Sequence, residues 1–369
     1  MKKYHIQKGD TLESIAHSFG ISVFELRDFH NTHCELSQLL GDKLTSHIKE
    51  ILYQTKEDGI QKDFSELKEK ESFELVLNPD ASVESYGVQI SFFENEVENS
   101  LKYNLKLRWL QRNLVKIQRE KLYINNEESN LMADELAHAI SSVLYPLELK
   151  VNSAGEITDI NNYPEIVQRW KESLPKLQKY YKGEQTEKYI RKNEHVLSNP
   201  DLLFRSLTND WFLHAFFNGL YHKYDLKKEM KIPRTFPMIP FLNPVEYIVT
   251  PRISTLEEDG EKLIQITLEG KTSDPRSRFD FENESYFPTR DPEDSEIPPA
   301  RGTYKAKYFL TPDYYTLDGF YLECTLELEK TKKVYVTSSR IKKQSQLIIE
   351  EGIIEIVKPK EKKNSFLYD

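Results

Sequence analysis

The sequence predicts an α+β protein in which a small βααβ module precedes a larger domain, built on a curved antiparallel sheet with a central helical block. Three observations lead to this prediction. The first half-hundred residues read as strand, helix, helix and strand. Apolar side chains then alternate at every second position over 72–124 and again over 245–357, and they follow helical spacing over 128–224. Strands, then helices, then strands are typical of α+β domains with helices on one face of the sheet.

The composition narrows the class of protein. A chain of 369 residues suggests two or three domains, and 51 basic against 60 acidic residues give a net charge of −9, which disfavours nucleic acid as a partner. The two cysteines, Cys34 and Cys324, cannot form a disulfide framework. No apolar run approaches the ~20 residues that cross a bilayer. The first residues lack the apolar stretch of a signal peptide, so we expect a protein that is cytoplasmic at synthesis, without membrane insertion, and delivered to the envelope only by another route.

Residues 1–54 form the predicted module. Tyr4 and Ile6 fall on one face of a first strand, and a turn at 8–10 precedes a helix whose N-cap is Asp10 or Thr11. A second helix begins at Ser22, and a closing strand covers 48–53. The apolar positions at helical spacing, which form the inner faces of the two helices, are Leu12, Ile15, Ala16, Phe19, Val23, Leu26 and Phe29.

These residues resemble a LysM module: YHIQKGDTL at 4–12, IA at 15–16, FGIS at 19–22 and Leu26 stand in the family's order and spacing. The resemblance implies a βααβ fold that binds glycans containing N-acetylglucosamine, such as peptidoglycan or chitin, in a shallow groove between two loops. It implies that one wall of the groove is formed by Gly9, Asp10, Thr11 and Leu12, and the other by Cys34, Glu35, Leu36 and Ser37. The sequence departs from the family at 30–34, HNTHC, and its closing strand comes late, so a LysM-like fold that docks protein instead of sugar stays open.

The remainder is divided as follows. Residues 55–71 are a charged linker, 72–357 the α+β domain and 358–369 a tail, with a long exposed loop expected at 271–302. The segment 114–124 is either a strand or a short helix, and a proline-rich crossing is expected at 232–244. The helical block contains a hairpin at 147–151 and 157–160. Its helices are predicted at 130–144, 162–174, 186–197 and 200–223, and the later strands at 247–251, 263–268, 304–310, 321–328, 333–337 and 347–356.

The sequence offers only weak catalytic or metal-binding candidates. His30, His33 and Cys34 have ligand chemistry that suits zinc but not a usual chelating spacing. Residues Glu135 and His138 lack the second motif of a di-iron site, and an acidic run at 291–296 reads more simply as a solvated turn. Asp210 and His214 can place a polar pair beside a cavity. The aromatic side chains around them follow helical spacing, however, and such a pattern is typical of a hydrophobic core. We therefore expect no catalytic residue, no metal and no cofactor.

The resulting prediction is a non-enzymatic peptidoglycan-binding protein whose large domain binds a protein partner. LysM modules without export signals occur in contractile injection machines, and this resemblance implies an adaptor, a chaperone or a baseplate or spike component of a type VI-like system, with an effector, spike or baseplate protein as partner. Two alternatives remain open. One is a cell-wall hydrolase with an unrecognised catalytic domain, since 60 acidic residues can supply a carboxylate pair. The other is an interaction scaffold whose LysM fold has lost its sugar.

Overall fold

The structure is a computed structural model. It describes residues 2–19, 21, 23–34, 38, 40, 44, 48–53, 70–79, 81–94, 97–125, 127–128, 131–258, 261–289 and 298–341. The predicted linker up to residue 69, the acidic run 291–296, the strand at 347–356 and the tail 358–369 lie outside these residues.

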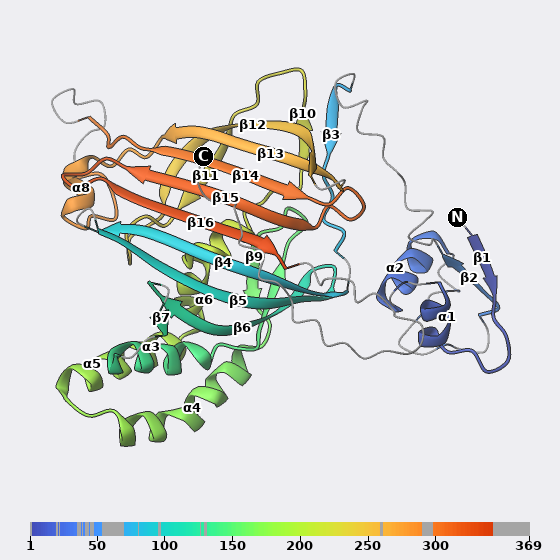
Figure 1. Cartoon of the computed structure of the whole chain (residues 1–369), viewed down its shortest axis with the longest axis horizontal. Coiled ribbons are helices and arrows are strands. Elements are labelled where there is room, and N and C mark those ends of the chain that lie inside the picture. The colour runs from blue at the N-terminus through green and yellow to red at the C-terminus, as the bar shows by residue number, and fades with distance from the viewer. Residues whose placement is uncertain are drawn as a thin grey trace, which may run out of the picture.

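The N-terminal unit has the predicted order of elements, which are β1 (Lys2–His5), α1 (Leu12–Ser18), α2 (Val23–His33) and β2 (Glu50–Tyr53) (Figure 1). The two strands pair antiparallel from Lys2↔Tyr53 to His5↔Glu50. The two helices pack on this ribbon through one compact apolar cluster that shares no residue with the core of the larger unit. The fully buried members of the cluster are Leu12, Ile15, Ala16, Leu26, Leu40, Ile48 and Ile51.

The larger unit is built on a twelve-stranded antiparallel sheet. Its strand order is β11-β12-β13-β14-β15-β16-β4-β5-β6-β8-β9, with β7 paired to β6. The strands are β4 (Val83–Glu94), β5 (Val97–Gln111), β6 (Leu114–Ile124), β7 (Glu127–Glu128), β8 (Leu147–Val151), β9 (Ile157–Ile160), β11 (Ile232–Phe236), β12 (Val245–Glu258), β13 (Glu261–Thr272), β14 (Thr303–Leu310), β15 (Leu317–Leu326) and β16 (Lys332–Arg340). The strands β3 (Ser72–Glu74) and β10 (Lys223–Asp225) pair separately.

Alternation of buried and exposed side chains explains why these segments are strands. On β14 every second side chain, from Tyr304 to Leu310, is fully buried, while Lys305 and Lys307 are exposed. The segment 114–124, for which a strand or a helix was open, is the strand β6. The pairing of β16 with β4, from Val334↔Phe92 to Arg340↔Tyr86, joins the strands that follow the helical block to those that precede it. One sheet therefore contains both predicted strand regions.

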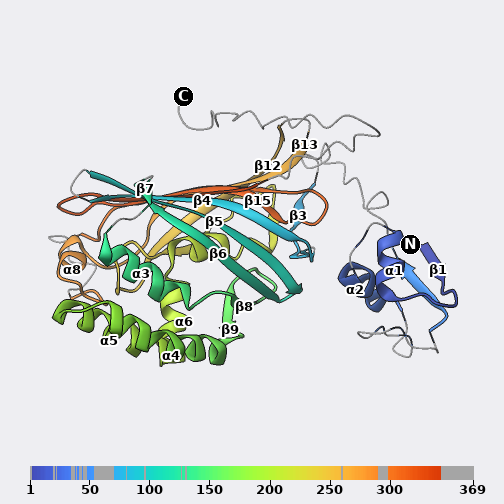
Figure 2. The same ribbon diagram turned by 60° about the horizontal axis from the view of Figure 1, so that its bottom comes forward.

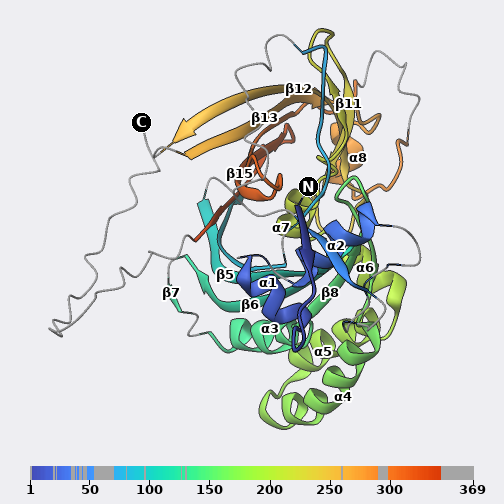
Figure 3. The same ribbon diagram turned by 90° about the vertical axis from the view of Figure 1, so that its right-hand side faces the viewer.

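Helices lie on one face of this sheet (Figure 2). They are α3 (Met132–Ser142), α4 (Tyr163–Tyr180), α5 (Glu184–Leu197), α6 (Pro200–Thr208), α7 (Trp211–Phe216) and the short α8 (Arg278–Glu282). The helix α7 contacts β4 and β16 in the middle of the sheet and also β11 at its edge. Contact with both places requires the sheet to curve around α7, as seen from the side in Figure 3. The predicted curved sheet with a central helical block is confirmed.

Three local predictions were wrong. The single helix expected at 200–223 is two helices, because the Asp210 side chain accepts the Leu213 amide and starts α7 anew. The proline-rich crossing contains the strand β11, where Pro233 is tolerated because β11 is an edge strand. The expected exposed loop at 271–302 contains α8 and several buried polar side chains.

Candidate functional site

The turn after β1 carries the first wall of the predicted groove. Its Lys8-Gly9 corner is possible because Gly9 has φ +98°, a left-handed conformation that other residues adopt only at a cost. The Asp10 amide donates to the Gln7 carbonyl at 3.2 Å, which closes the turn. A Cβ atom placed on Gly9 would meet no atom within 4 Å, so the outer side of the corner is open to a ligand.

Asp10 holds this turn to the strand. Its Oδ2 accepts the Gln7 amide at 2.7 Å and the Tyr4 hydroxyl at 2.9 Å. The hydrogen bond to Asp10, together with burial and the carboxylate charge, raises the pKa of the Tyr4 phenol above its usual 10.0, because ionisation would place a second negative charge beside the carboxylate. The Tyr4 ring in turn packs edge-on against Phe19, with 5.3 Å between centroids. Asp10 is therefore a structural member of the wall.

The next two residues connect the turn to α1. Thr11 is the N-cap: its hydroxyl accepts the Ser14 amide at 3.1 Å and the Ser14 hydroxyl accepts the Thr11 amide at 2.9 Å, which is a capping box. The Thr11 side chain is exposed beside the Gly9 corner. The Leu12 side chain is only 1% exposed and packs in the core of the N-terminal unit. It therefore cannot present an apolar surface to a sugar.

Comparison with known proteins supports this geometry at the level of the family. A family model described as LysM domain matches residues 4–29, which span β1, the turn, α1 and most of α2. Residues 4–29 are a LysM domain. A LysM domain is a binding module and not a catalytic one, and its presence supports binding of peptidoglycan or another N-acetylglucosamine glycan.

The other comparisons are less informative. No curated protein matches the chain. A solved structure described as "lipid-protein interactions in lipovitellin" is 10% identical over 75% of this chain, with a TM-score of 0.37. The chain spans about a quarter of the lipovitellin chain, 26% of its length.

The second wall of the LysM groove is described only at Cys34. This residue is half-buried just after α2, and its amide donates to the His30 carbonyl at 2.9 Å. The other three predicted members, Glu35, Leu36 and Ser37, lie outside the described residues. The role of this wall in sugar binding therefore stays a prediction.

Two residues outside the predicted groove and directly after the matched range hold the N-terminal unit together. His30 is 2% exposed; its Nδ1 accepts the Leu52 amide at 2.9 Å, and its Nε2 lies 2.8 Å from the Gln38 carbonyl. Since an amide can only donate, Nδ1 carries no proton, and Nε2 is the donor to Gln38. The Asn31 side chain contacts both the amide and the carbonyl of Leu40, at 2.7 and 2.9 Å. The sequence signal for both was the polar pair His30-Asn31 directly after the last apolar position of α2.

This bonding also bears on the zinc alternative. Both ring nitrogens of His30 are used by backbone groups, so neither has a lone pair available for a metal. In the part of the chain that the structure describes, no three His, Cys, Asp or Glu side chains are arranged to hold a metal ion.

The large domain has a pocket of about 430 Å³ between the two edge strands of its sheet, β9 and β11, with α7 between them. His214 lines this pocket, as the sequence suggested, whereas Asp210 serves as the N-cap of α7. The two ring nitrogens of His214 lie 2.8 and 2.7 Å from the carbonyl oxygens of Thr208 and Thr235. Burial lowers the pKa of His214. A neutral ring has one N–H and donates to only one of these carbonyls, here Thr208 if the Thr235 hydroxyl, 3.3 Å from Nε2, donates to the other nitrogen. The histidine then ties α6 and β11 to α7, so its role is structural.

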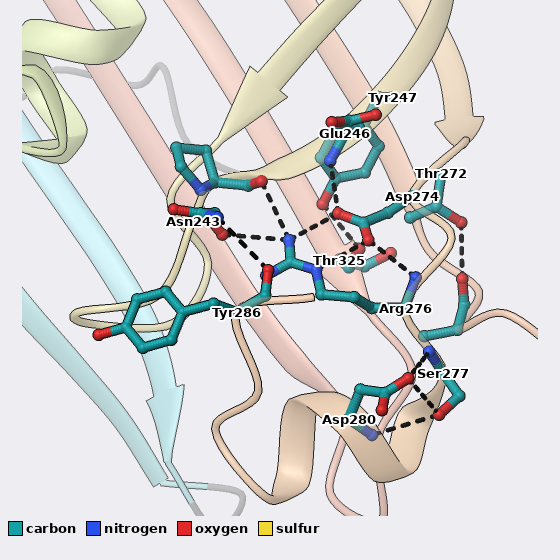
Figure 4. A network of polar contacts seen from close by, with 12 residues as sticks. Asn243, Glu246, Tyr247, Thr272, Asp274, Arg276, Ser277, Asp280, Tyr286 and Thr325 are labelled. Carbon is teal, nitrogen blue, oxygen red and sulfur yellow. Dashed lines mark hydrogen bonds and ion pairs between the residues drawn. The ribbon is translucent and has the colours of Figure 1, made fainter. Parts of the chain in front are cut away.

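A buried polar network lies at the start of β12 in the same domain and includes the segment expected to be an exposed loop (Figure 4). Asp274 Oδ1 accepts the backbone amide and Nε of Arg276, and Oδ2 accepts Arg276 Nη2 and the Glu246 amide. Four donors therefore satisfy the carboxylate, which leaves it no capacity for a cation. Arg276 Nη2 also donates to the carbonyls of Asn243 and Pro244, each at 3.1 Å. The network joins the segment before β12 to the segment before α8.

Within the described residues, no helix is both long and apolar enough to cross a membrane.

Proposed function

We propose that the protein binds peptidoglycan, or a related N-acetylglucosamine glycan, through the groove of its LysM domain. The match to the LysM family over residues 4–29 is the observation that carries this proposal. The first wall supports it: a Cβ atom added to Gly9 would meet no atom within 4 Å, so a sugar can approach the backbone there, and the exposed Thr11 supplies a hydroxyl beside it. Asp10, whose Oδ2 is occupied by Tyr4 and Gln7, keeps this wall in place.

The test is co-sedimentation of the full chain with insoluble peptidoglycan. Gly9→Val places a branched side chain over the open corner and strains its left-handed backbone, so we expect retention to fall about tenfold or more. Gly183→Val is the matched control, because Gly183 also has a left-handed φ, +115°, and open space around it, but lies in the large domain. Retention that is absent in the unaltered protein, or equal for both variants, would contradict the proposal.

We further infer that the large domain engages a protein partner, in the role of an adaptor, a chaperone or a baseplate or spike component of a contractile, type VI-like injection system. Exposed aromatic side chains support an interaction surface. Phe241, which is 87% exposed, has the left-handed φ +70°, an arrangement that is costly for a side chain of its size. Asn243, close by in sequence, contacts the Tyr286 carbonyl at 3.3 Å, and Phe287, 74% exposed, follows directly.

Cross-linking in the native cell, followed by mass spectrometry, tests this inference. We expect a sheath, tube, spike, baseplate or secreted effector protein to be recovered with the unaltered chain and lost with the double variant Phe241→Ser and Phe287→Ser. The double variant Tyr180→Ser and Tyr189→Ser is the control, because these rings are also exposed, at 69% and 41%, but lie on α4 and α5. Recovery of no such protein, or equal recovery with both double variants, would contradict it.

A further inference from the structure

Two opposite charges line the pocket of about 430 Å³ between β9 and β11. Arg234 lies on β11, and Glu156 lies directly before β9. In the part of the chain that the structure describes, neither side chain forms an ion pair. The volume lies within the range of small-molecule sites, about 300–1,000 Å³. The pocket therefore has the size of a ligand site, and it carries two charges that the protein itself does not pair.

The Arg234 guanidinium is held in place by backbone carbonyls. Nη1 donates to the Pro233 carbonyl and Nη2 to the Gly219 carbonyl, each at 3.0 Å. A guanidinium has five N–H groups, so three remain, and among the described residues these three have no acceptor. One of them, on Nε, is buried. Carbonyls fix the position of this half-buried cation, but a carboxylate binds it more strongly, through paired, charge-assisted hydrogen bonds.

Glu156 is fixed by the turn that joins β8 to β9. Asn152 Oδ1 accepts the amides of Ala154 and Glu156, at 3.0 and 2.9 Å, and Asn152 Nδ2 donates to Glu156 Oε2 at 2.8 Å. Glu156 Oε1 accepts no hydrogen bond from the residues that the structure describes. The Tyr221 amide donates to the Ala154 carbonyl at 3.1 Å, which attaches the turn to the segment after α7. One carboxylate oxygen is therefore held available for a donor in the pocket.

Gly219 brings the two charges near each other. It has the left-handed φ +62°, and a Cβ atom added to it would lie 2.7 Å from Glu156 Oε1. Its carbonyl is the one that accepts Arg234 Nη2. Both charged groups thus lie next to the same residue, although they are too far apart to form an ion pair. A ligand that contacts both must carry a negative and a positive group only a few bonds apart.

The rest of the lining indicates what else the ligand contains. Besides its polar residues, the pocket is lined by four apolar side chains, those of Ile157, Leu213, Phe217 and Pro233. Small-molecule sites usually combine such apolar walls with a few placed polar groups. An α-amino acid with an apolar side chain carries a carboxylate, an ammonium and an apolar group on one carbon, so it matches all three parts of the pocket.

We propose that this pocket binds a free α-amino acid with an apolar side chain. The ligand carboxylate accepts hydrogen bonds from the free N–H groups on Nη1 and Nη2 of Arg234, and the ligand ammonium donates to Glu156 Oε1. Its side chain contacts Ile157 and Phe217. Binding pairs both charges of the pocket, and the ligand has no net charge, so no further counter-ion is needed. This inference does not depend on the glycan or on the protein partner.

Isothermal titration calorimetry of the full chain with L-leucine tests the proposal. Two analogues separate the contributions of the two charges, because 4-methylpentanoate lacks the ammonium and 3-methylbutylamine lacks the carboxylate. We expect saturable binding of L-leucine at a single site per chain, about tenfold or more tightly than either analogue. Absence of saturable leucine binding, or an analogue that binds as tightly as leucine, would overturn the proposal.

Two variants locate the site. Glu156→Gln keeps an acceptor for Asn152 but removes the charge, and Arg234→Gln removes the guanidinium, so each should weaken leucine binding about tenfold or more. The controls are Arg252→Gln and Glu269→Gln, whose side chains form an exposed ion pair outside the pocket and should leave the affinity unchanged. Glu156 is exposed, so its variant remains a valid test even where Arg234→Gln unfolds. Unchanged leucine affinity in the Glu156→Gln variant would contradict the proposal.

Discussion

Asp274 and Arg276, two residues apart, form a buried ion pair in which Nη2 lies 2.6 Å from Oδ2 and Nε lies 2.9 Å from Oδ1. Their side chains are only 2% and 4% exposed. Arg276 also lies over the Phe281 ring, with its guanidinium carbon 4.4 Å from the centroid. The pair thus connects the start of β12, through Glu246, with α8, and it makes a loop-like sequence part of the core.

The first prediction concerns this pair. Asp274→Ala leaves a buried guanidinium without its counter-charge, so we expect the large domain to lose about 3–5 kcal/mol of unfolding free energy. Chemical denaturation followed by tryptophan fluorescence measures this loss, because all three tryptophans, Trp109, Trp170 and Trp211, lie in that domain. Asp159→Ala breaks the exposed pair with Lys150 and should cost less than about 1 kcal/mol. Equal losses would show that the buried pair contributes no more than a surface pair.

The second prediction concerns acid stability. Burial acts to raise the pKa of Asp280, but hydrogen bonds from Thr289 and Ser277 outweigh it and hold the pKa at about 2, below the usual 3.8. A carboxyl whose pKa is lower in the folded state stabilises the fold above pH 3.8, and the stabilisation is lost as the pH falls through 2. The unfolding free energy that is lost when this carboxyl is protonated is about 2 kcal/mol.

Asp280→Asn should therefore flatten the fall in unfolding free energy between about pH 4 and pH 2, with denaturation curves recorded at each pH. Asp201→Asn provides the comparison, because Asp201 is exposed in the first turn of α6. The idea fails if the Asp280→Asn variant keeps the full slope of the unaltered protein over this range.

The third prediction concerns His30. His30→Ala removes an acceptor from the Leu52 amide and a donor from the Gln38 carbonyl, and we expect a loss of about 2–4 kcal/mol from the LysM domain. The exchange rate of the Leu52 amide reports this loss directly. His17→Ala, on the exposed side of α1, should leave that rate unchanged. An unchanged rate in the His30→Ala variant would refute the assigned bonding.

The fourth prediction concerns Tyr4 and Asp10. Asp10→Asn removes the carboxylate charge and should lower the pKa of Tyr4 toward 10.0, as followed by carbon-13 tyrosine NMR. Because the folded-state pKa of Tyr4 is raised, its contribution to stability is complete below pH 10 and is lost as the pH rises through the raised pKa. Tyr4→Phe should abolish this part of the alkaline dependence. A Tyr4 pKa that does not move in the Asp10→Asn variant would exclude Asp10 as its cause.

The LysM domain shows how far sequence alone can reach. Glycine, the capping residues and the apolar spacing act over a few residues, so β1, the turn, α1 and α2 were predictable from local chemistry. The roles of His30 and Asn31 were not, because their partners Gln38, Leu40 and Leu52 are distant in sequence. For Leu12 the helical spacing correctly predicted an inner-face position, whereas the place in the groove wall that the LysM resemblance implied does not agree with its burial.

In the large domain, two-residue alternation was enough to predict most strands but not their neighbours. Alternation reports which face is buried, and it carries no information about which strand lies alongside. The burial of Asp274 and Arg276 could not be predicted either, since charged residues in a proline-rich segment are usually solvated. The break at Asp210 was missed because the apolar spacing continues from α6 through α7.

The pairing of β16 with β4 has a consequence for biosynthesis. Phe92 emerges from the ribosome long before Val334, its partner in the finished sheet. At about 5–20 residues per second, the roughly 240 residues between them take about 12–50 s to translate. Throughout that interval the early hairpin of β4 and β5 has one side without its native neighbour, so the nascent chain is most vulnerable to aggregation before β16 is made.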